Sequence, residues 1–196
     1  MKRTNTRKLT SVAMLAAVST VLMFFSFNVP LMPAFIKLDL SELPALIASF
    51  TFGPLAGVTV CLVKNIINVF FTTTGGIGEI SNFLLGAMFV APAGFIYQKL
   101  RTKKGAIIAS LVGAAIMALL SVLTNYFIVY PVYSNIMAPM DAILGAYKAI
   151  NPNVETLMDA LVWFNMPFTF IKGMISVVIT MLIYKPLAPV LRGKTK

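Results

Sequence analysis

The chain has 196 residues, of which 59% are hydrophobic and only 11% are charged, and its mean hydropathy is +0.89. An ordinary soluble domain carries about 25% charged residues. A water-soluble protein of this length would expose too much surface to cover with so few charges, so most of the surface must face lipid. These values exclude a soluble globular domain and indicate an integral membrane protein.

Residue types that several enzyme classes need are missing from the sequence. It contains no histidine and one cysteine, Cys61, which lies inside an apolar run. Zinc and haem sites, Cys–His nucleophiles and internal disulfides are therefore excluded, and we expect no metal and no cofactor. The basic stretch Lys103-Lys104-Gly105 lacks the upstream glycine and the Ser or Thr of a phosphate-binding loop, so ATP hydrolysis by that route is not expected.

The net charge of +10 is concentrated in three clusters that flank apolar stretches. Twelve of the 16 basic residues belong to them: Lys2, Arg3, Arg7 and Lys8; Lys99, Arg101, Lys103 and Lys104; Lys185, Arg192, Lys194 and Lys196. None of the clusters interleaves with aromatic residues on a polar domain, so a nucleic-acid partner is a remote second interpretation. The pattern is typical of the positive-inside rule, which places both termini and the loop around 99–104 in the cytoplasm.

Cytoplasmic segments on one chain must be separated by an even number of membrane crossings. About 90 residues lie between the first two clusters, which is enough for four passes of about 17–25 residues each. Two further passes fit before the C-terminus. The expected fold is an all-α membrane protein, a bundle of six transmembrane helices with cytoplasmic N- and C-termini.

The first half of the chain is punctuated by prolines and glycines. We expect a first helix over about residues 9–29, stopped by Pro30 and Pro33, and retained as a helix because its small residues do not form a signal-peptide cleavage site. Residues 41–74 are expected to turn once, at Gly53-Pro54, which leaves two short or tilted passes.

The next two helices are longer. A fourth helix is expected over about residues 76–97, and a fifth over about 105–130, ended by Pro131. Residues 131–151 then form an outside segment, in which 139–150 has an amphipathic pattern.

A sixth helix is expected to begin at Asn151-Pro152 and to reach about Tyr184, with Glu155 and Asp159 near its positive end. In this topology every acidic residue falls in or beside an outer loop: Asp39, Glu42, Glu79, Asp141, Glu155 and Asp159. The polar chemistry is therefore expected to collect on the outer face.

Three amides, Asn82, Asn125 and Asn165, fall at similar outer depth on three different helices. A polar side chain at membrane depth costs free energy unless it finds a partner or lines a wet cavity. Each amide alone is well explained as a hydrogen bond between helices. The three together favour a shared pocket.

The sixth helix carries a polar stripe, because Asn165, Thr169 and Lys172 are spaced by four and three residues. Lys172 lies near the expected midplane and must face the bundle, where it either pairs with backbone groups, stays neutral, or contacts a substrate oxygen. Lys64, beside Asn65 and close to Asn68, poses the same question, and we assign it a structural role.

Small residues four positions apart, Ala13 and Ala17, lie on the first helix. Such pairs let another helix approach closely. They serve either internal packing or the docking of a separate membrane subunit. We expect such a partner because the chain has no nucleotide-binding motif of its own.

Several stretches resemble the riboflavin-specific substrate-binding (S) component of energy-coupling-factor (ECF) vitamin importers. They are residues 33–44 (PAFIKLDLSELP), 52–57 (FGPLAG), 64–65 (KN), 78–83 (GEISNF) and 165–173 (NMPFTFIKG). Thr169 departs from the pattern, because we expect asparagine there. The resemblance implies a single transmembrane substrate-binding domain over residues 1–196 in a bacterial plasma membrane. It also implies an outward-opening pocket for riboflavin, and docking through the Ala13/Ala17 strip on a transmembrane coupling subunit that carries two ATPase subunits.

Riboflavin combines a flat apolar ring, one edge of donors and acceptors, and a hydroxylated chain, which suits amides, hydroxyls and aromatic side chains. The candidate substrate-binding residues are Phe35, Leu38, Asp39, Asn82, Asn125, Tyr126, Asn165, Thr169 and Lys172. Two alternatives stay open. One is an S component for another vitamin; the other is a small membrane enzyme with Glu79, Asp39 and Lys172 as acid–base candidates.

Overall fold

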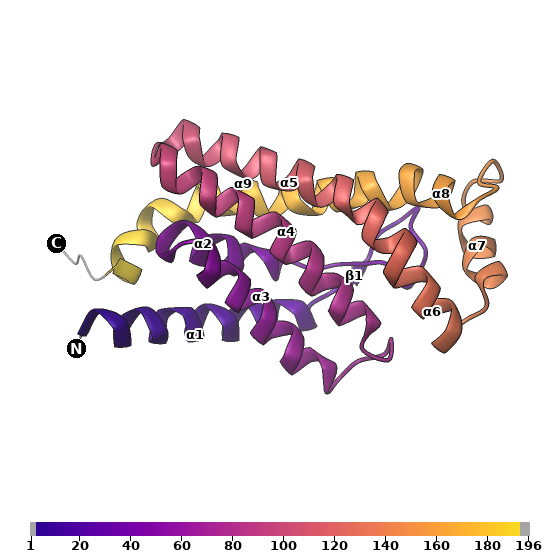
Figure 1. The fold of residues 1–196 in the computed structure, drawn as a ribbon, viewed down its shortest axis with the longest axis horizontal. Helices are drawn as coiled ribbons and strands as arrows, with labels where there is room; N and C mark the ends of the chain where they lie inside the picture. The colour runs from indigo at the N-terminus through magenta and orange to yellow at the C-terminus, as the bar shows by residue number, and fades with distance from the viewer. Residues whose placement is uncertain (1–2, 193–196) are drawn as a thin grey trace.

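The computed structural model of the chain describes residues 3–192 and shows an elongated bundle of helices (Figure 1). Lys2, Lys194 and Lys196 of the basic clusters lie outside the described residues, as do the side chains of Arg3, Lys185 and Arg192. The helices are α1 (Arg3–Phe24), α2 (Glu42–Phe52), α3 (Pro54–Val69), α4 (Ile77–Leu100), α5 (Lys103–Thr124), α6 (Tyr130–Ile136), α7 (Met140–Lys148), α8 (Leu157–Ala160) and α9 (Met166–Arg192). Two π-helical turns, η1 (Asn125–Val129) and η2 (Leu161–Asn165), join α5 to α6 and α8 to α9.

Four helical stretches in the described part of the chain are long and apolar enough to cross a membrane: Thr6–Phe24, Ile77–Leu100, Lys103–Ile136 and Leu157–Tyr184. The helices α2 and α3 are apolar but shorter. The protein is therefore an all-α membrane protein, and the expected pair of short helices is present.

The corner between α2 and α3 lies at Gly53, as the sequence predicts. Gly53 ends α2 with φ +103°, a conformation that side chains with a Cβ rarely adopt. Pro54 then occupies the first turn of α3, where its missing N–H leaves no hydrogen bond unmade. These two residues together reverse the chain between the short helices.

The first helix is shorter at its C-terminal end than predicted, since α1 ends at Phe24 and not near Val29. The following residues, 25–41, form a segment that we call the strap. Within it, β1 (Phe27–Asn28) pairs antiparallel with β2 (Lys37–Leu38). Backbone groups of Phe27 and Asn28 thus bond to β2, and not to a further helical turn.

The prediction that Pro131 ends the fifth helix is wrong. The π turn η1 shifts the hydrogen-bond register, so that Pro131 falls in the first turn of α6, where a missing N–H is tolerated. The helical stretch therefore continues to Ile136, and only the remainder of 131–151 lies outside it. The amphipathic piece predicted within 139–150 is present as α7.

The boundaries predicted for the sixth helix are also wrong. Asn151 accepts a hydrogen bond from the backbone of Asn153 (3.1 Å) and so stabilises a local turn. The helix starts one loop later, where Thr156 and Asp159 form a reciprocal capping box. At its other end α9 passes through Pro186 to Arg192.

The two described ends of the chain lie at the same end of the bundle, together with the α4–α5 turn, and α7 lies at the opposite end (Figure 1). The main apolar core includes Leu46, Val60 and Phe89, whereas a smaller core surrounds Ile143 and Tyr147 of α7. The helices α4 and α5 pack closely where Gly113 of α5 faces Phe89 of α4. The lack of a side chain at Gly113 permits this approach, because a Cβ there would lie only 2.7 Å from the Phe89 carbonyl oxygen.

Candidate ligand-binding site

A cavity of about 730 Å³ lies inside the bundle, bounded by the strap, the C-terminal end of α3, α4, the two π turns and α9. Seven of the nine predicted binding residues line it: Phe35, Asp39, Asn82, Asn125, Asn165, Thr169 and Lys172. The structure thus brings together side chains from the strap and from three separate helical stretches. A cavity with mixed apolar and polar walls is the usual form of a small-molecule site.

Leu38 and Tyr126, the other two predicted residues, do not line the cavity. Side chains alternate along a strand, so Lys37 and Asp39 face the cavity while Leu38 is buried on the other side. Tyr126 is the residue after Asn125 in the π turn and therefore points to a different side of the helix. It is 37% exposed, and its ring packs against Phe127.

Each π turn contributes an amide to the cavity. Asn125 is the first residue of η1, and Asn165 is the last residue of η2. Both side chains are more than nine-tenths buried. Because π turns are rare and concentrate at functional sites, their presence beside both amides supports a binding role. An apolar sequence window carries no clear signal for such a turn.

Asn165 belongs to a small hydrogen-bond network with two tyrosines. The Tyr147 hydroxyl donates to Asn165 Oδ1 (2.6 Å), Asn165 Nδ2 donates to the Tyr130 hydroxyl (3.0 Å), and the two hydroxyls bond to each other. Burial raises the pKa of Tyr147, which therefore keeps its proton as a donor. The network fixes the amide orientation and leaves one N–H and one lone pair of Asn165 for a ligand.

Aromatic side chains surround Phe35 at the same place. Its ring lies 6.5 Å from Tyr130, 5.9 Å from Tyr133 and 5.9 Å from Tyr147, measured between ring centroids. Sequence reasoning did not single out these tyrosines for the site. Tyr147 lies on the buried face of amphipathic α7, a pattern that predicts core packing but not its approach to Asn165.

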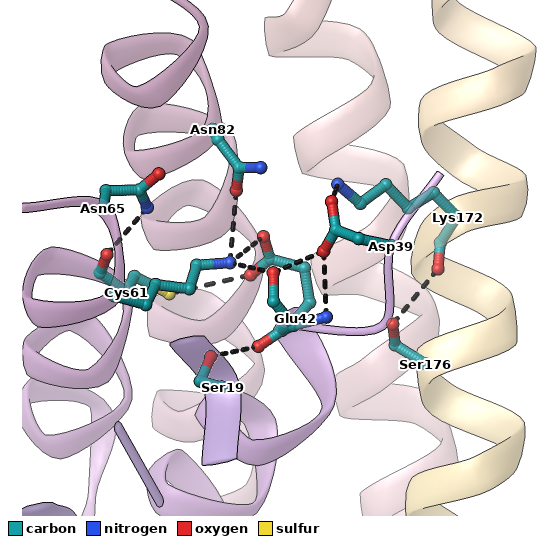
Figure 2. A network of polar contacts seen from close by, with 10 residues as sticks. Ser19, Asp39, Glu42, Cys61, Asn65, Asn82, Lys172 and Ser176 are labelled. Atoms are coloured by element: carbon teal, nitrogen blue, oxygen red, sulfur yellow. Dashed lines mark hydrogen bonds and ion pairs between the residues drawn. The ribbon is translucent and has the colours of Figure 1, made fainter. Parts of the chain in front are cut away.

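Two ion pairs lie deep in the bundle next to the cavity (Figure 2). Lys172 Nζ lies 2.8 Å from Asp39 Oδ2, and Lys64 Nζ lies 2.7 Å from Glu42 Oε1. Asp39 lies in the strap and Glu42 directly follows it, as predicted for residues in or beside a connecting segment, but both side chains are buried. The strap turns inward, and the buried ammonium groups compensate the carboxylates.

Ser41 joins the two ion pairs. Its backbone N–H (2.9 Å) and its hydroxyl both donate to Asp39 Oδ1, and the hydroxyl accepts from Lys64 Nζ (2.5 Å). Lys64 also donates to Asn82 Oδ1 (3.1 Å), which lines the cavity. Burial raises the pKa of Asp39, but the charges of Lys172 and Lys64 outweigh this effect and hold that pKa below its usual range.

The two small residues predicted to form a docking strip on α1 lie on the surface of the bundle. Ala13 and Ala17 are exposed, whereas Ala16 is 2% exposed and packs in the core. On the buried side of the same helix, the Ser19 hydroxyl donates a hydrogen bond to the Ser41 carbonyl oxygen (2.5 Å; Figure 2). The helix is therefore fixed inside by Ser41 and leaves its two small residues outside.

Curated relatives resemble this chain over nearly its full length. It is 35% identical over 95% of its length to riboflavin transporter RibU of Staphylococcus aureus (strain TCH60), of which 93% is covered. It is 32% identical to riboflavin transporter FmnP of Bacillus subtilis (strain 168), with 93% of each chain covered.

A solved structure of the S component of a bacterial ECF transporter superposes with a TM-score of 0.75 and 33% identity, covering 95% of this chain and 98% of the other. Residues 7–184 match the family described as "ECF transporter, substrate-specific component". Because this match spans most of the chain, the protein belongs to the family of substrate-specific components of ECF transporters.

Proposed function

We propose that this chain is the riboflavin-binding component of an ECF-type importer, which captures riboflavin outside the cell and delivers it through an ATPase-coupled module. The observation that carries the proposal is the cavity, where amides from α4, η1 and η2 meet an aromatic wall around Phe35. Two full-length relatives named as riboflavin transporters support the same ligand.

The cavity chemistry suits a flavin. Asn165 and Asn125 offer paired donors and acceptors, as the pyrimidine edge of the ring requires. Phe35 and its tyrosine neighbours provide flat apolar surface for the ring itself. Lys172 and Thr169 add a cation and a hydroxyl for ligand oxygens.

The chain is not an enzyme, because its family consists of transporter components. Glu79, Asp39 and Lys172, the acid–base candidates of that alternative, have other partners. Lys172 and Asp39 compensate each other's charge, and Glu79 accepts hydrogen bonds from Thr72 and Thr74.

The purified protein is expected to be yellow, because a bound flavin absorbs visible light, and to quench riboflavin fluorescence on titration. Asn165→Ala should weaken riboflavin binding at least about tenfold, since it leaves polar groups of the ligand without partners. Asn135→Ala serves as the matched control, because Asn135 is exposed and bonds only to the Pro131 carbonyl oxygen. Wild-type affinity in the Asn165 variant would remove η2 from the site, and no quenching by any form would favour another vitamin.

For the membrane arrangement we propose six crossings, formed by the four long stretches with α2 and α3, in a bacterial cell membrane. Both termini and the α4–α5 turn are cytoplasmic in this topology. The shared end of these segments in Figure 1 and the basic residues Arg7, Lys8, Lys99 and Lys104 support it.

A cysteine at Thr102, in the α4–α5 turn, is expected to resist an impermeant thiol reagent applied to intact cells and to react after permeabilisation. A cysteine at Asn153, in the exposed loop before α8, should react in intact cells. The native Cys61 is buried and does not interfere. Labelling of residue 102 from outside would overturn the topology.

The proposed partners are riboflavin, membrane lipid, a transmembrane coupling subunit and two ATPase subunits. The exposed strip of Ala13 and Ala17 supports docking of the coupling subunit on α1.

A further inference from the structure

One amide that faces the cavity has no hydrogen-bond partner for its nitrogen. Asn68, near the end of α3, is 8% exposed and lines the cavity, and its Nδ2 is buried without any acceptor among the described residues. Buried polar groups are nearly always paired, so an orphaned donor that lines a binding cavity points to a ligand acceptor.

A carboxylate with spare acceptor capacity lines the same cavity. Glu79, in the first turn of α4, accepts hydrogen bonds from Thr72 (2.8 Å) and Thr74 (3.3 Å), both through Oε2. No described donor bonds to its Oε1, and no described lysine or arginine forms an ion pair with it. Its second oxygen is therefore available to accept from a ligand.

We propose that Asn68 and Glu79 form a subsite that binds the hydroxylated chain of the ligand. The inference rests on the proposed function, since riboflavin supplies such a chain. A hydroxyl group both accepts and donates, and the subsite offers the Asn68 N–H as donor and Glu79 Oε1 as acceptor. The polar edge of the flavin ring has a single N–H donor, and the amide oxygens of Asn125 and Asn165 already offer acceptors for it, whereas each hydroxyl of the chain brings a donor of its own.

The position of the subsite in the fold agrees with this assignment. The aromatic wall and the Asn165 network come from the strap, α6, α7 and η2. Asn68 and Glu79 come from α3 and α4, the two helices on either side of the connection 70–76. The ring and the chain of one ligand are therefore held by different elements.

The test compares two asparagines of α3 with two flavins. In Asn68→Leu the orphaned amide is replaced by an apolar side chain of similar size, so the fold is expected to persist. Asn65→Leu is the matched control: Asn65 is also buried, with an unpartnered Oδ1, but its Nδ2 donates to the Cys61 carbonyl oxygen and it does not line the cavity. Each purified protein is titrated with riboflavin and with lumiflavin, which has the same ring and a methyl group in place of the hydroxylated chain.

Asn68→Leu is expected to lose at least about tenfold in riboflavin affinity and to keep wild-type affinity for lumiflavin, which also reports an intact ring site. Glu79→Ala should show the same selective loss, and Asn65→Leu should match the wild type with both flavins. An unchanged riboflavin affinity in Asn68→Leu, or an equal loss for both flavins, would overturn the subsite. If lumiflavin binds the wild type too weakly to titrate, equal riboflavin affinities of the two leucine variants overturn it. A wild type that binds neither flavin would instead remove the proposed function.

Discussion

Replacing Lys64 by methionine is expected to destabilise the protein by about 3–5 kcal/mol, because it leaves the Glu42 carboxylate buried without its cation. Lys64 is 0% exposed and Glu42 is 2% exposed, so neither group can recover hydration from solvent. The same change removes the hydrogen bonds from Lys64 Nζ to Ser41 and Asn82. For a chain of this size the loss corresponds to a fall in melting temperature of about 6–20 °C.

Thermal unfolding of the purified protein in detergent measures this effect. The control is the double variant Lys64→Met/Glu42→Leu, which removes both charges and is expected to recover most of the lost stability, since apolar replacement of a whole buried pair is often neutral. A single variant that melts with the wild type would show that the pair contributes nothing. A double variant no more stable than the single one would assign the loss to packing around Lys64.

The overall helical plan could be predicted because it depends on local signals. Gly53 and Pro54 mark the corner between α2 and α3, and the apolar runs mark the long helices. The boundaries that failed depend on hydrogen bonds that a sequence window does not reveal. In the sequence, Pro131 predicts the end of a helix, because nothing reveals the π turn that precedes it. Asn151 likewise predicts a helix N-cap, but its side chain accepts a hydrogen bond from the Asn153 backbone in a local turn.

The candidate site was partly predictable for a similar reason. A polar side chain is costly inside a membrane, so a polar residue within an apolar run can be recognised from the sequence without knowledge of the tertiary structure. Asn125, Asn165 and Lys172 stand out in this way. Their partners do not, because Asp39 reaches Lys172 across 133 positions of sequence and only through the inward strap. Tyr147 likewise reads as a core residue of α7, and its bond to Asn165 depends on how that helix packs.

Asn68 shows what the structure adds to sequence reasoning. In the sequence it is one of two neighbouring asparagines on α3, and no spacing rule separates it from Asn65. The cavity wall separates them, because Asn68 lines it and Asn65 does not. Their hydrogen bonds differ too, since only Asn65 uses its amide nitrogen within the protein.

Replacing Ala13 or Ala17 by tryptophan is expected to abolish riboflavin uptake by cells while leaving riboflavin binding by the purified protein unchanged. Both alanines are exposed on α1, so a large ring there does not enter the core. It does prevent another helix from approaching α1 at the short distance that small residues allow. In the proposed function the coupling subunit makes this contact, which connects riboflavin binding to ATP hydrolysis by the ATPase subunits.

Uptake of labelled riboflavin and fluorescence titration, made on the same variants, separate transport from binding. Leu119→Trp on α5 is the control, because Leu119 is 63% exposed and a tryptophan there adds bulk at the surface away from α1. It should transport and bind normally. Normal uptake by both alanine variants would exclude α1 as the docking surface. Loss of binding together with uptake would show that the change reaches the cavity, by way of the Ser19–Ser41 hydrogen bond that ties α1 to the strap.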